Sequence, residues 1–371
     1  MREPNITVVE GELMDQGVGA TRLVAVPAHA LRSLIARLFE AGGVPAADAV
    51  LVAEVLTEAD LRGVESHGST RVAGYLSMMR LGLLNPRPVV QVLRDLPSTA
   101  MLEGDNAFGI VVARRAMQMA MDKATTAGIA CVTVRNVTHT GLVGFYTMMA
   151  ARAGFIGISM NNGPSILPPF GGTTPTYATN PFSFAVPAGE KDPIVLDMAT
   201  SVVAGGKLRL AAKKGTPIPA DWALDREGRP TTDPVEAIQH GFMQWAGGYK
   251  GFGVATMVEV LGGVLSGGLF GTDVPAMKDF GKEPLVTSGF YMAINPAHFM
   301  TPEEFKVRVD RLIDMVKASG RAPGVEEVYI AGEIEFRRRA ERLKNGIPLS
   351  DVVHRELKTL AEGARVPFDL A

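Results

Sequence analysis

The residue types best suited to acid–base chemistry stand close together in segment 66–71, which reads Ser-His-Gly-Ser-Thr-Arg. Imidazole titrates near neutral pH, so His67 can give and take a proton. The guanidinium of Arg71 is a planar fork that matches a carboxylate with two parallel hydrogen bonds. If the segment is helical, both side chains share one face, and Tyr75 follows one turn later. This spacing predicts a proton donor beside a carboxylate clamp. The alternative is a helix start, capped by Ser66, with a solvated basic face.

A second histidine, His139, follows a predicted strand over residues 129–134 and precedes a predicted helix. Ligands of α/β sheets gather at the carboxyl ends of strands, so this position also suits acid–base chemistry. The alternative is a histidine in a surface loop. No His, Cys and acidic residues have the spacing of metal ligands, so no metal is expected. The remaining histidines are predicted to be structural or solvated: His29, His240, His298 and His354.

Two further segments could hold a cofactor that carries phosphates. Residues 247–253 read Gly-Gly-Tyr-Lys-Gly-Phe-Gly and lead into an apolar helix, whose free N–H groups would attract phosphate beside Lys250. The alternative is a tight turn that lets the helix pack closely. Asp197 ends a predicted strand, where it could accept hydrogen bonds from ribose hydroxyls or orient a catalytic histidine. The sequence has no GxGxxG fingerprint, so a dinucleotide would not bind in the usual Rossmann manner.

Hydrophobic periodicity predicts the elements that position these residues. The first ninety residues are predicted to be mostly helical, and Glu54 and Glu58 are expected to face outward. Further along, short apolar runs alternate with helices, which predicts an α/β layer with parallel pairs of strands. Residues 161–181, rich in Pro, Gly, Asn and Thr, are predicted to form a functional loop. The predicted helices span about 27–41, 46–61, 66–81, 107–126, 142–152, 202–213 and 252–265, with three more after Pro302; the predicted strands span 129–134, 155–160, 182–186, 194–196 and 289–294.

Composition narrows the class of protein. The chain has 371 residues, of which 47% are hydrophobic and 20% charged, as in globular proteins with a large core. The net charge of -2 shows no excess of positive charge of the kind that binds nucleic acid. The single cysteine, Cys131, lies in an apolar run and is expected to be a buried thiol in a reducing compartment. No signal peptide and no membrane-spanning stretch is recognisable. We therefore expect a cytoplasmic protein without nucleic-acid or membrane partners.

Taken together, these segments resemble the malate/L-lactate dehydrogenase family, which is unrelated to the Rossmann-type lactate and malate dehydrogenases. That family also contains ureidoglycolate, sulfolactate and diketogulonate enzymes, and piperideine-2-carboxylate and pyrroline-2-carboxylate reductases. The resemblance runs in consistent order from about residue 25 to 345. Its motifs are Ala59-Asp60 with Arg62-Gly63, Ser66-His67-Gly68, Phe170-Gly171-Gly172, Thr179-Asn180-Pro181-Phe182, Asp197-Met198-Ala199-Thr200-Ser201, Pro230-Thr231-Thr232-Asp233-Pro234 and Gly248-Tyr249-Lys250-Gly251.

The resemblance implies a homodimer with a non-Rossmann α/β fold. Residues 1–95 together with 300–371 would form a helical domain, and residues 96–299 a central NAD(P)-binding domain with a mixed sheet. The implied reaction moves a hydride between NAD or NADP and C2 of a small 2-hydroxy or 2-oxo acid. Reduction of a cyclic imine is the alternative, and a non-catalytic binding protein is a third. The implied site residues are His139, His67 and Arg71 for catalysis and Gly163, Asp197, Met198, Ala199, Lys250, Gly332, Glu333 and Ile334 for the cofactor.

One departure from the family pattern concerns the loop after the predicted strand that ends at Met160. Many members have a Thr or Ser there, whereas this chain reads Asn161-Asn162-Gly163-Pro164-Ser165. A changed hydroxyl alters which polar groups meet the substrate, and such differences shift specificity by several powers of ten. The identity of the acid therefore does not follow from the resemblance.

Overall fold

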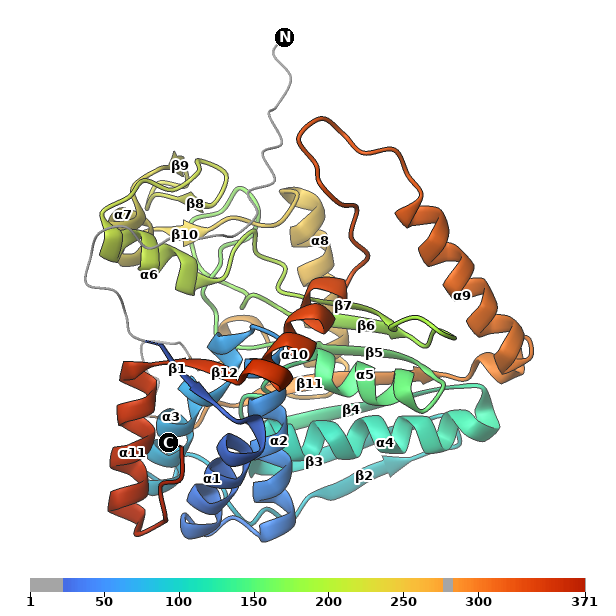
Figure 1. The fold of residues 1–371 in the computed structure, drawn as a ribbon, viewed down its shortest axis with the longest axis horizontal. Helices are drawn as coiled ribbons and strands as arrows, with labels where there is room; N and C mark the ends of the chain where they lie inside the picture. The colour runs from blue at the N-terminus through green and yellow to red at the C-terminus, as the bar shows by residue number, and fades with distance from the viewer. Residues whose placement is uncertain (1–22, 276–282, 371) are drawn as a thin grey trace.

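The computed structural model describes residues 23–275 and 283–370 (Figure 1). Its centre is a seven-stranded sheet in the order β2-β3-β4-β11-β5-β6-β7. Of the neighbouring pairs in this sheet, β3 and β4 are parallel and the others antiparallel. The strands are β2 Gln91–Asp95, β3 Thr99–Ala107, β4 Ile129–Val137, β5 Ile156–Asn161, β6 Phe182–Val186, β7 Ile194–Met198 and β11 Thr287–Ile294.

The mixed α/β fold is confirmed, but the expectation of parallel neighbours holds for β3 and β4 alone. The reason is that β11, from far along the chain, inserts between β4 and β5 and runs antiparallel to both. In the same way β6 separates β5 from β7. Consequently β3, β4, β5 and β7 still point in one direction, although antiparallel strands lie between most of them. Their carboxyl ends meet at one edge of the sheet.

Helices α4 Gly109–Ala127 and α5 Gly144–Arg152 lie against the sheet, as predicted, each beginning two residues later than expected (Figure 1). The inner face of α4 is lined by small side chains. Ala113, Ala116 and Ala120 are fully buried, so the helix approaches the strands closely. This packing places the loops before both helices at the edge where β3 and β4 end.

The N-terminal helices α1 Ala28–Ala41, α2 Ala46–Leu61 and α3 Val72–Arg80 form a second layer with α11 Asp351–Ala364 (Figure 1). The short strand β1 Leu23–Val26 pairs antiparallel with β12 Ile347–Ser350, which joins the two ends of the described chain. One continuous apolar core runs from these helices into the central sheet. The division into a helical domain (1–95 with 300–371) and a central domain (96–299) stays a prediction.

The remaining elements lie around the central sheet (Figure 1). A small three-stranded sheet in the order β10-β8-β9 packs with α6 and α7 around a separate apolar cluster. No helix among the described residues has the length and hydrophobicity needed to cross a bilayer. The bounds are α6 Gly205–Lys214, β8 Ala223–Leu224, β9 Pro230–Thr231, α7 Pro234–Gln239, β10 Phe242–Met243, α8 Tyr249–Val258 with a π-helical continuation Glu259–Val264, α9 Pro302–Lys317 and α10 Glu333–Asn345.

Candidate active site

Residues 66–71 do not start an α-helix. They form two consecutive 3-10 turns, Glu65–His67 and Ser69–Arg71, and α3 begins only at Val72. The expected α-helical face shared by His67 and Arg71 is therefore wrong. Both side chains nevertheless stay half-buried and close to each other, because the turns are short and continuous with the helix.

The shape of this turn follows from the buried carboxylate of Asp60, near the end of α2. Its Oδ2 accepts the main-chain N–H of Ser69 at 2.8 Å. Gly68 lies directly against the same carboxylate, where an added Cβ would be 1.8 Å from Oδ1. Since the carboxylate captures an N–H that a helix would use, the chain takes tight turns here. The buried carboxylate of Asp60 thus shapes the turn, and Gly68 leaves the space that this carboxylate occupies.

The turn brings the two candidate histidines together. The ring centroids of His67 and His139 are 5.2 Å apart. Nδ1 of His67 lies 2.9 Å from the hydroxyl of Ser66, and Nδ1 of His139 lies 2.6 Å from the hydroxyl of Tyr75. Among the described residues, no hydrogen-bond partner reaches the Nε2 atom of either ring. One polar cluster therefore unites segment 66–75 with the loop after β4.

The contact with Tyr75 can hold His139 in more than one protonation state. The main-chain N–H of Gly141 also lies 3.4 Å from Nδ1, and an N–H can only donate. In that arrangement Nδ1 accepts and the neutral ring carries its proton on Nε2. A hydroxyl can donate or accept, so Tyr75 also suits a ring protonated on Nδ1. The orientation of His139 is thus kept while its proton moves.

The surroundings favour the neutral imidazoles. Burial, and less strongly the charge of Arg71, lower the pKa of His67 to about 4. Burial also lowers the pKa of His139 well below its ordinary value, with added repulsion from His67 and Arg71. The buried hydroxyl of Tyr75 has a raised pKa for the same reason. Both rings are ready to accept a proton at neutral pH, and an anionic ligand would favour the charged form.

Arg71 has the geometry of a carboxylate clamp. Its Nε donates to the main-chain oxygen of Ser66 at 2.6 Å, which fixes the plane of the guanidinium. Within the described ranges, no residue accepts a hydrogen bond from its two Nη groups. Two parallel N–H donors therefore face outward from a fixed plane, which is the arrangement that a carboxylate fits.

Asp197 lies at the same edge of the sheet, near the end of β7. Its Oδ2 accepts the N–H of Gly144 at 2.8 Å, so the carboxylate stabilises the start of α5. A Cβ on Gly144 would lie 2.6 Å from that oxygen. Solvent reaches the side chain on one side, while surrounding protein raises the pKa of Asp197 to about 6, partly offset by the Gly144 N–H. No described histidine hydrogen-bonds to Asp197, so a role in orienting one is not seen.

Three other predicted cofactor segments reach this edge. Gly163 is buried in the loop after β5, where an added Cβ would lie 3.2 Å from Ala178. Met198 ends β7, and Ala199 follows it, both half-buried. Gly332, with φ +90°, lies so close to β7 that a Cβ would be 2.9 Å from the backbone of Val195. The structure thus gathers glycines and strand ends from three distant parts of the chain.

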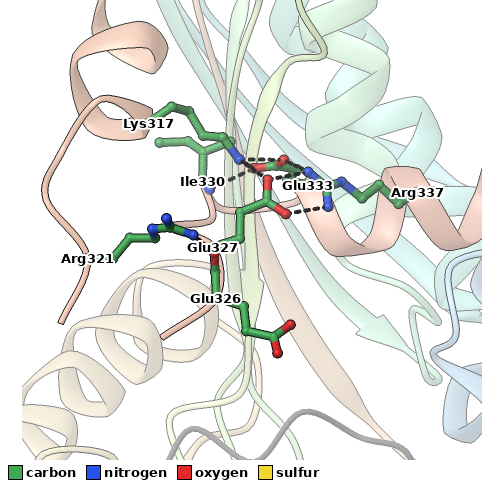
Figure 2. A network of polar contacts seen from close by, with 7 residues as sticks. All are labelled: Lys317, Arg321, Glu326, Glu327, Ile330, Glu333 and Arg337. Carbon is green, nitrogen blue, oxygen red and sulfur yellow. Dashed lines mark hydrogen bonds and ion pairs between the residues drawn. The ribbon is translucent and has the colours of Figure 1, made fainter. Parts of the chain in front are cut away.

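The side chain of Glu333 is committed to an ion cluster (Figure 2). Lys317 Nζ lies 2.8 Å from Glu333 and 2.6 Å from Glu327, and Arg337 pairs with both carboxylates. The N–H of Ile330 also donates to Glu333, at 3.1 Å. Any contribution of Glu333 to a cofactor site would therefore come from its main chain.

Lys250 lies in the first turn of α8 and is exposed, as is Ile334 at 40%. The glycines around Lys250 have structural reasons of their own. Gly247 and Gly248 adopt φ of 67° and 66°, and a Cβ on Gly251 would lie 2.1 Å from the oxygen of Ala246. The alternative interpretation of a tight turn is therefore confirmed, and phosphate binding stays a prediction.

Two buried carboxylates were not anticipated as organising residues. Glu58, expected to face outward, is 7% exposed and pairs with Arg62 and Arg339 at 2.9 Å each. The arginine four residues later was the available signal, since such spacing pairs charges on a helix. Glu259 accepts from Asn180 and from the Gly271 N–H at 2.7 Å each, and so ties down the loop 161–181.

The buried Asp60 carboxyl predicts a pH-dependent stability. Burial raises its pKa from 3.8 to about 7, with a smaller raising effect of Glu65 opposed by Ser69 and Arg342. Between these values the folded chain holds a proton that the unfolded chain releases, so its stability falls as pH rises. Asp60→Asn keeps an acceptor for Ser69 but cannot titrate. We expect the free energy of unfolding in urea, wild type minus variant, to decrease from about pH 5 to about pH 8. A constant difference would contradict this assignment.

Comparison with known proteins gives a consistent result over nearly the whole chain. A profile of the malate/L-lactate dehydrogenase family matches residues 26–358. The malate dehydrogenase of Pyrococcus horikoshii is 40% identical, over 94% of this chain and 98% of that protein. The NAD(+)-dependent ureidoglycolate dehydrogenase of Escherichia coli K12 is 36% identical, over 88% of this chain and 93% of that protein. The solved sulfolactate dehydrogenase of Methanocaldococcus jannaschii superposes with a TM-score of 0.88 and 36% identity, over 93% of this chain and 98% of that chain.

Proposed function

This chain belongs to the malate/L-lactate dehydrogenase family, and from this premise we propose that it oxidises small 2-hydroxy acids, or reduces 2-oxo acids, with NAD or NADP. Family membership makes it a dehydrogenase with a nicotinamide cofactor. The observation that supports the substrate class is the guanidinium fork of Arg71, held on the same turn as His67 and beside His139. A substrate carboxylate bound by the Arg71 guanidinium would bring C2 of the substrate close to an imidazole.

The edge formed by Gly163, Asp197 and Gly332 suits a nicotinamide coenzyme. The two glycines let their segments pack closely on Ala178 and Val195, which brings their main chain to the sheet, and the accessible carboxylate of Asp197 can accept from ribose hydroxyls. The bound coenzyme supplies the hydride chemistry. In this proposal Lys250 adds a positive charge for a phosphate of the coenzyme, and Ala199 and Ile334 line the coenzyme site. The residues of the chain bind and orient the substrate and the coenzyme, and they move a proton.

We assign the proton to Nε2 of His139. In the oxidative direction the neutral ring accepts the proton of the substrate hydroxyl, and in the reductive direction it returns that proton to the oxygen. Tyr75 keeps the ring in place through both states, because its hydroxyl can donate or accept. Arg71 holds the substrate carboxylate and thereby fixes the geometry of approach. His67, whose ring lies beside that of His139 at a tilt of 33°, is the other candidate for the same role.

The direct test is coenzyme turnover by the purified protein. NADH and NADPH would each be combined with oxaloacetate, pyruvate, glyoxylate or piperideine-2-carboxylate, and NAD and NADP with the 2-hydroxy acids, ureidoglycolate included. Turnover of a hydroxy or oxo acid supports the proposal and identifies the coenzyme. Turnover confined to the cyclic imine would replace it with the reductase alternative. A protein that binds neither coenzyme would contradict the enzyme assignment.

Replacing Arg71 by lysine tests the carboxylate clamp. An ammonium group cannot form two parallel hydrogen bonds, so we expect KM for the acid to rise by roughly 10-fold or more, with a smaller effect on kcat. Arg80→Lys is the matched control, because Arg80 is exposed at the end of α3, the helix that follows this turn. Steady-state kinetics at saturating coenzyme measure both variants. An unchanged KM in Arg71→Lys would remove Arg71 from the binding site.

We also propose that the protein acts as a homodimer. Exposed apolar side chains of Leu93, Leu96, Val264 and Leu265 line one hollow on the surface. Large apolar patches are uncommon on monomers, which supports an interface there. Sedimentation equilibrium provides the measurement, since the chain has a mass of 39.4 kDa. A species of that mass at micromolar concentration would contradict the dimer.

A further inference from the structure

Helix α10 reaches from the cofactor edge of the sheet to the turn that carries His67. At its start, Gly332 packs against β7, and Ala331 accepts the N–H of Val195 at 2.9 Å. In its second half, Arg342 projects onto the end of α2 and the first 3-10 turn. One rigid helix thus contacts both parts of the proposed active site, although it lies far from either in the sequence.

Arg342 makes two contacts, one just before the turn and one at its first residue. One Nη donates to the main-chain oxygen of Asp60, and the other lies 2.7 Å from Oε1 of Glu65. The side chain of Arg342 is 16% exposed and that of Glu65 is 49% exposed. Glu65 is the first residue of the 3-10 turn that ends at His67. A single guanidinium therefore bridges the point where the chain leaves α2 and the point where the turn begins.

Hydrogen bonds within residues 60–71 also shape the turn, among them the one from Arg71 Nε to the main-chain oxygen of Ser66. Ser69 donates its N–H to Asp60, and Thr70 donates its hydroxyl to the main-chain oxygen of Glu65 at 2.6 Å. The Asp60 carboxylate, with its Oδ1 unpartnered in the described structure, has no ion pair. Asp60 and Glu65 are both anchors of the turn, and Arg342 is hydrogen-bonded to both.

We propose that Arg342 is a positioning residue of the active site, which holds the 65–71 turn so that His67 and Arg71 meet the substrate correctly. This inference rests on the proposed function, which makes the 65–71 turn part of the active site. Arg342 touches neither substrate nor cofactor in this assignment. It acts by joining the main chain at Asp60 to the side chain of Glu65 and thereby fixing their separation. The geometry of approach is sensitive to shifts of about 1 Å, so loss of the bridge lowers the rate.

The same helix offers a matched control. Arg339 lies one turn earlier on α10 and pairs with Glu58 on α2 at 2.9 Å. It does not contact the turn, and Glu58 keeps its partner Arg62 when Arg339 is removed. Arg339→Gln and Arg342→Gln therefore remove the same group from the same helix. They differ in whether the lost contact reaches residues 65–71.

The experiment combines kinetics with hydrogen exchange of the full chain. In Arg342→Gln we expect kcat/KM for the acid to fall by about 10- to 100-fold, while KM for the coenzyme stays within about twofold. Amide exchange in residues 62–72 is expected to rise by about tenfold or more, and Arg342→Lys is expected to recover part of both losses, because Lys can still pair with Glu65. In Arg339→Gln both readouts should match the wild type within about twofold.

Three outcomes would overturn the proposal. Unchanged exchange and kinetics in Arg342→Gln would mean that the bridge does not position the turn. An equal loss of acid and coenzyme affinity, with faster exchange throughout the chain, would mean a general effect on folding. If Arg342→Gln does not fold, Glu65→Gln, which removes the other partner of the same ion pair, with wild-type exchange and kinetics would be the contradicting result. A wild type without turnover would contradict the proposed function alone, since the exchange of residues 62–72 still shows whether Arg342 orders the turn.

Discussion

Replacing His139 by alanine is expected to lower kcat by about 10²- to 10⁴-fold, the usual effect of removing a general acid–base group. His139 is the imidazole whose orientation is held by a buried hydroxyl, that of Tyr75, at 2.6 Å. Its pKa is lowered well below the ordinary value by burial, so the ring is neutral and can accept a proton. Without it, no group in this position takes the proton of the substrate hydroxyl. KM for the coenzyme should change little.

The comparison with His67→Ala decides between the two histidines. The two rings lie 5.2 Å apart, so each can come near the same substrate oxygen. If His139 carries the proton, His67→Ala loses less activity than His139→Ala, and Tyr75→Phe loses activity in the same direction as His139→Ala. His29→Ala is the control, because His29 is exposed on α1. A larger loss in His67→Ala would assign the proton to His67. Near-normal rates in both variants would show the site assignment to be wrong.

Replacing Gly68 by alanine is expected to destabilise the fold by about 1–3 kcal/mol and to reduce kcat/KM by roughly 10²-fold. The added methyl group would lie 1.8 Å from Oδ1 of Asp60. Asp60 cannot move aside easily, because its side chain is fully buried and accepts the N–H of Ser69. The turn must shift instead, and it carries His67 and Arg71 with it.

Gly74 provides the matched control for this steric effect. It lies in α3, and an added Cβ there would meet nothing within 4 Å. Gly74→Ala is expected to stabilise the helix by about 0.5–1 kcal/mol and to leave kinetics unchanged. Urea unfolding and steady-state kinetics of both variants provide the measurement. If Gly68→Ala is as stable as Gly74→Ala, the close contact between Gly68 and Asp60 is not what shapes the turn.

Much of the local structure could be predicted from the sequence. Helices α1 and α2 begin and end within about two residues of the predicted bounds, because proline, paired glycines and apolar periodicity act over a few residues. The strand before His139 and the strand that ends near Asp197 were also found, from short apolar runs. Strand β2 was not found. Its residues are all exposed, so it has no pattern of burial to detect.

The nature of the turn at 66–71 could not be predicted from spacing. Its sequence is compatible with a helix, and only the carboxylate of Asp60, reaching Ser69 from the end of α2, makes tight turns the better solution. The burial of Glu58 has a similar cause. Arg339 arrives from α10, 281 residues later, and together with Arg62 neutralises a carboxylate that would otherwise need solvent.

The sequence by itself determined most of the helices, several strands, the family and the residue types available for chemistry. These depend on local periodicity and on ordered motifs, which are properties of the chain as written. Only the tertiary structure decided that β11 separates β4 from β5, that the rings of His67 and His139 meet, and that Arg342 bridges the turn. Such contacts join residues far apart in the chain. They form because burial of apolar surface and pairing of buried charges are satisfied for the whole molecule at once.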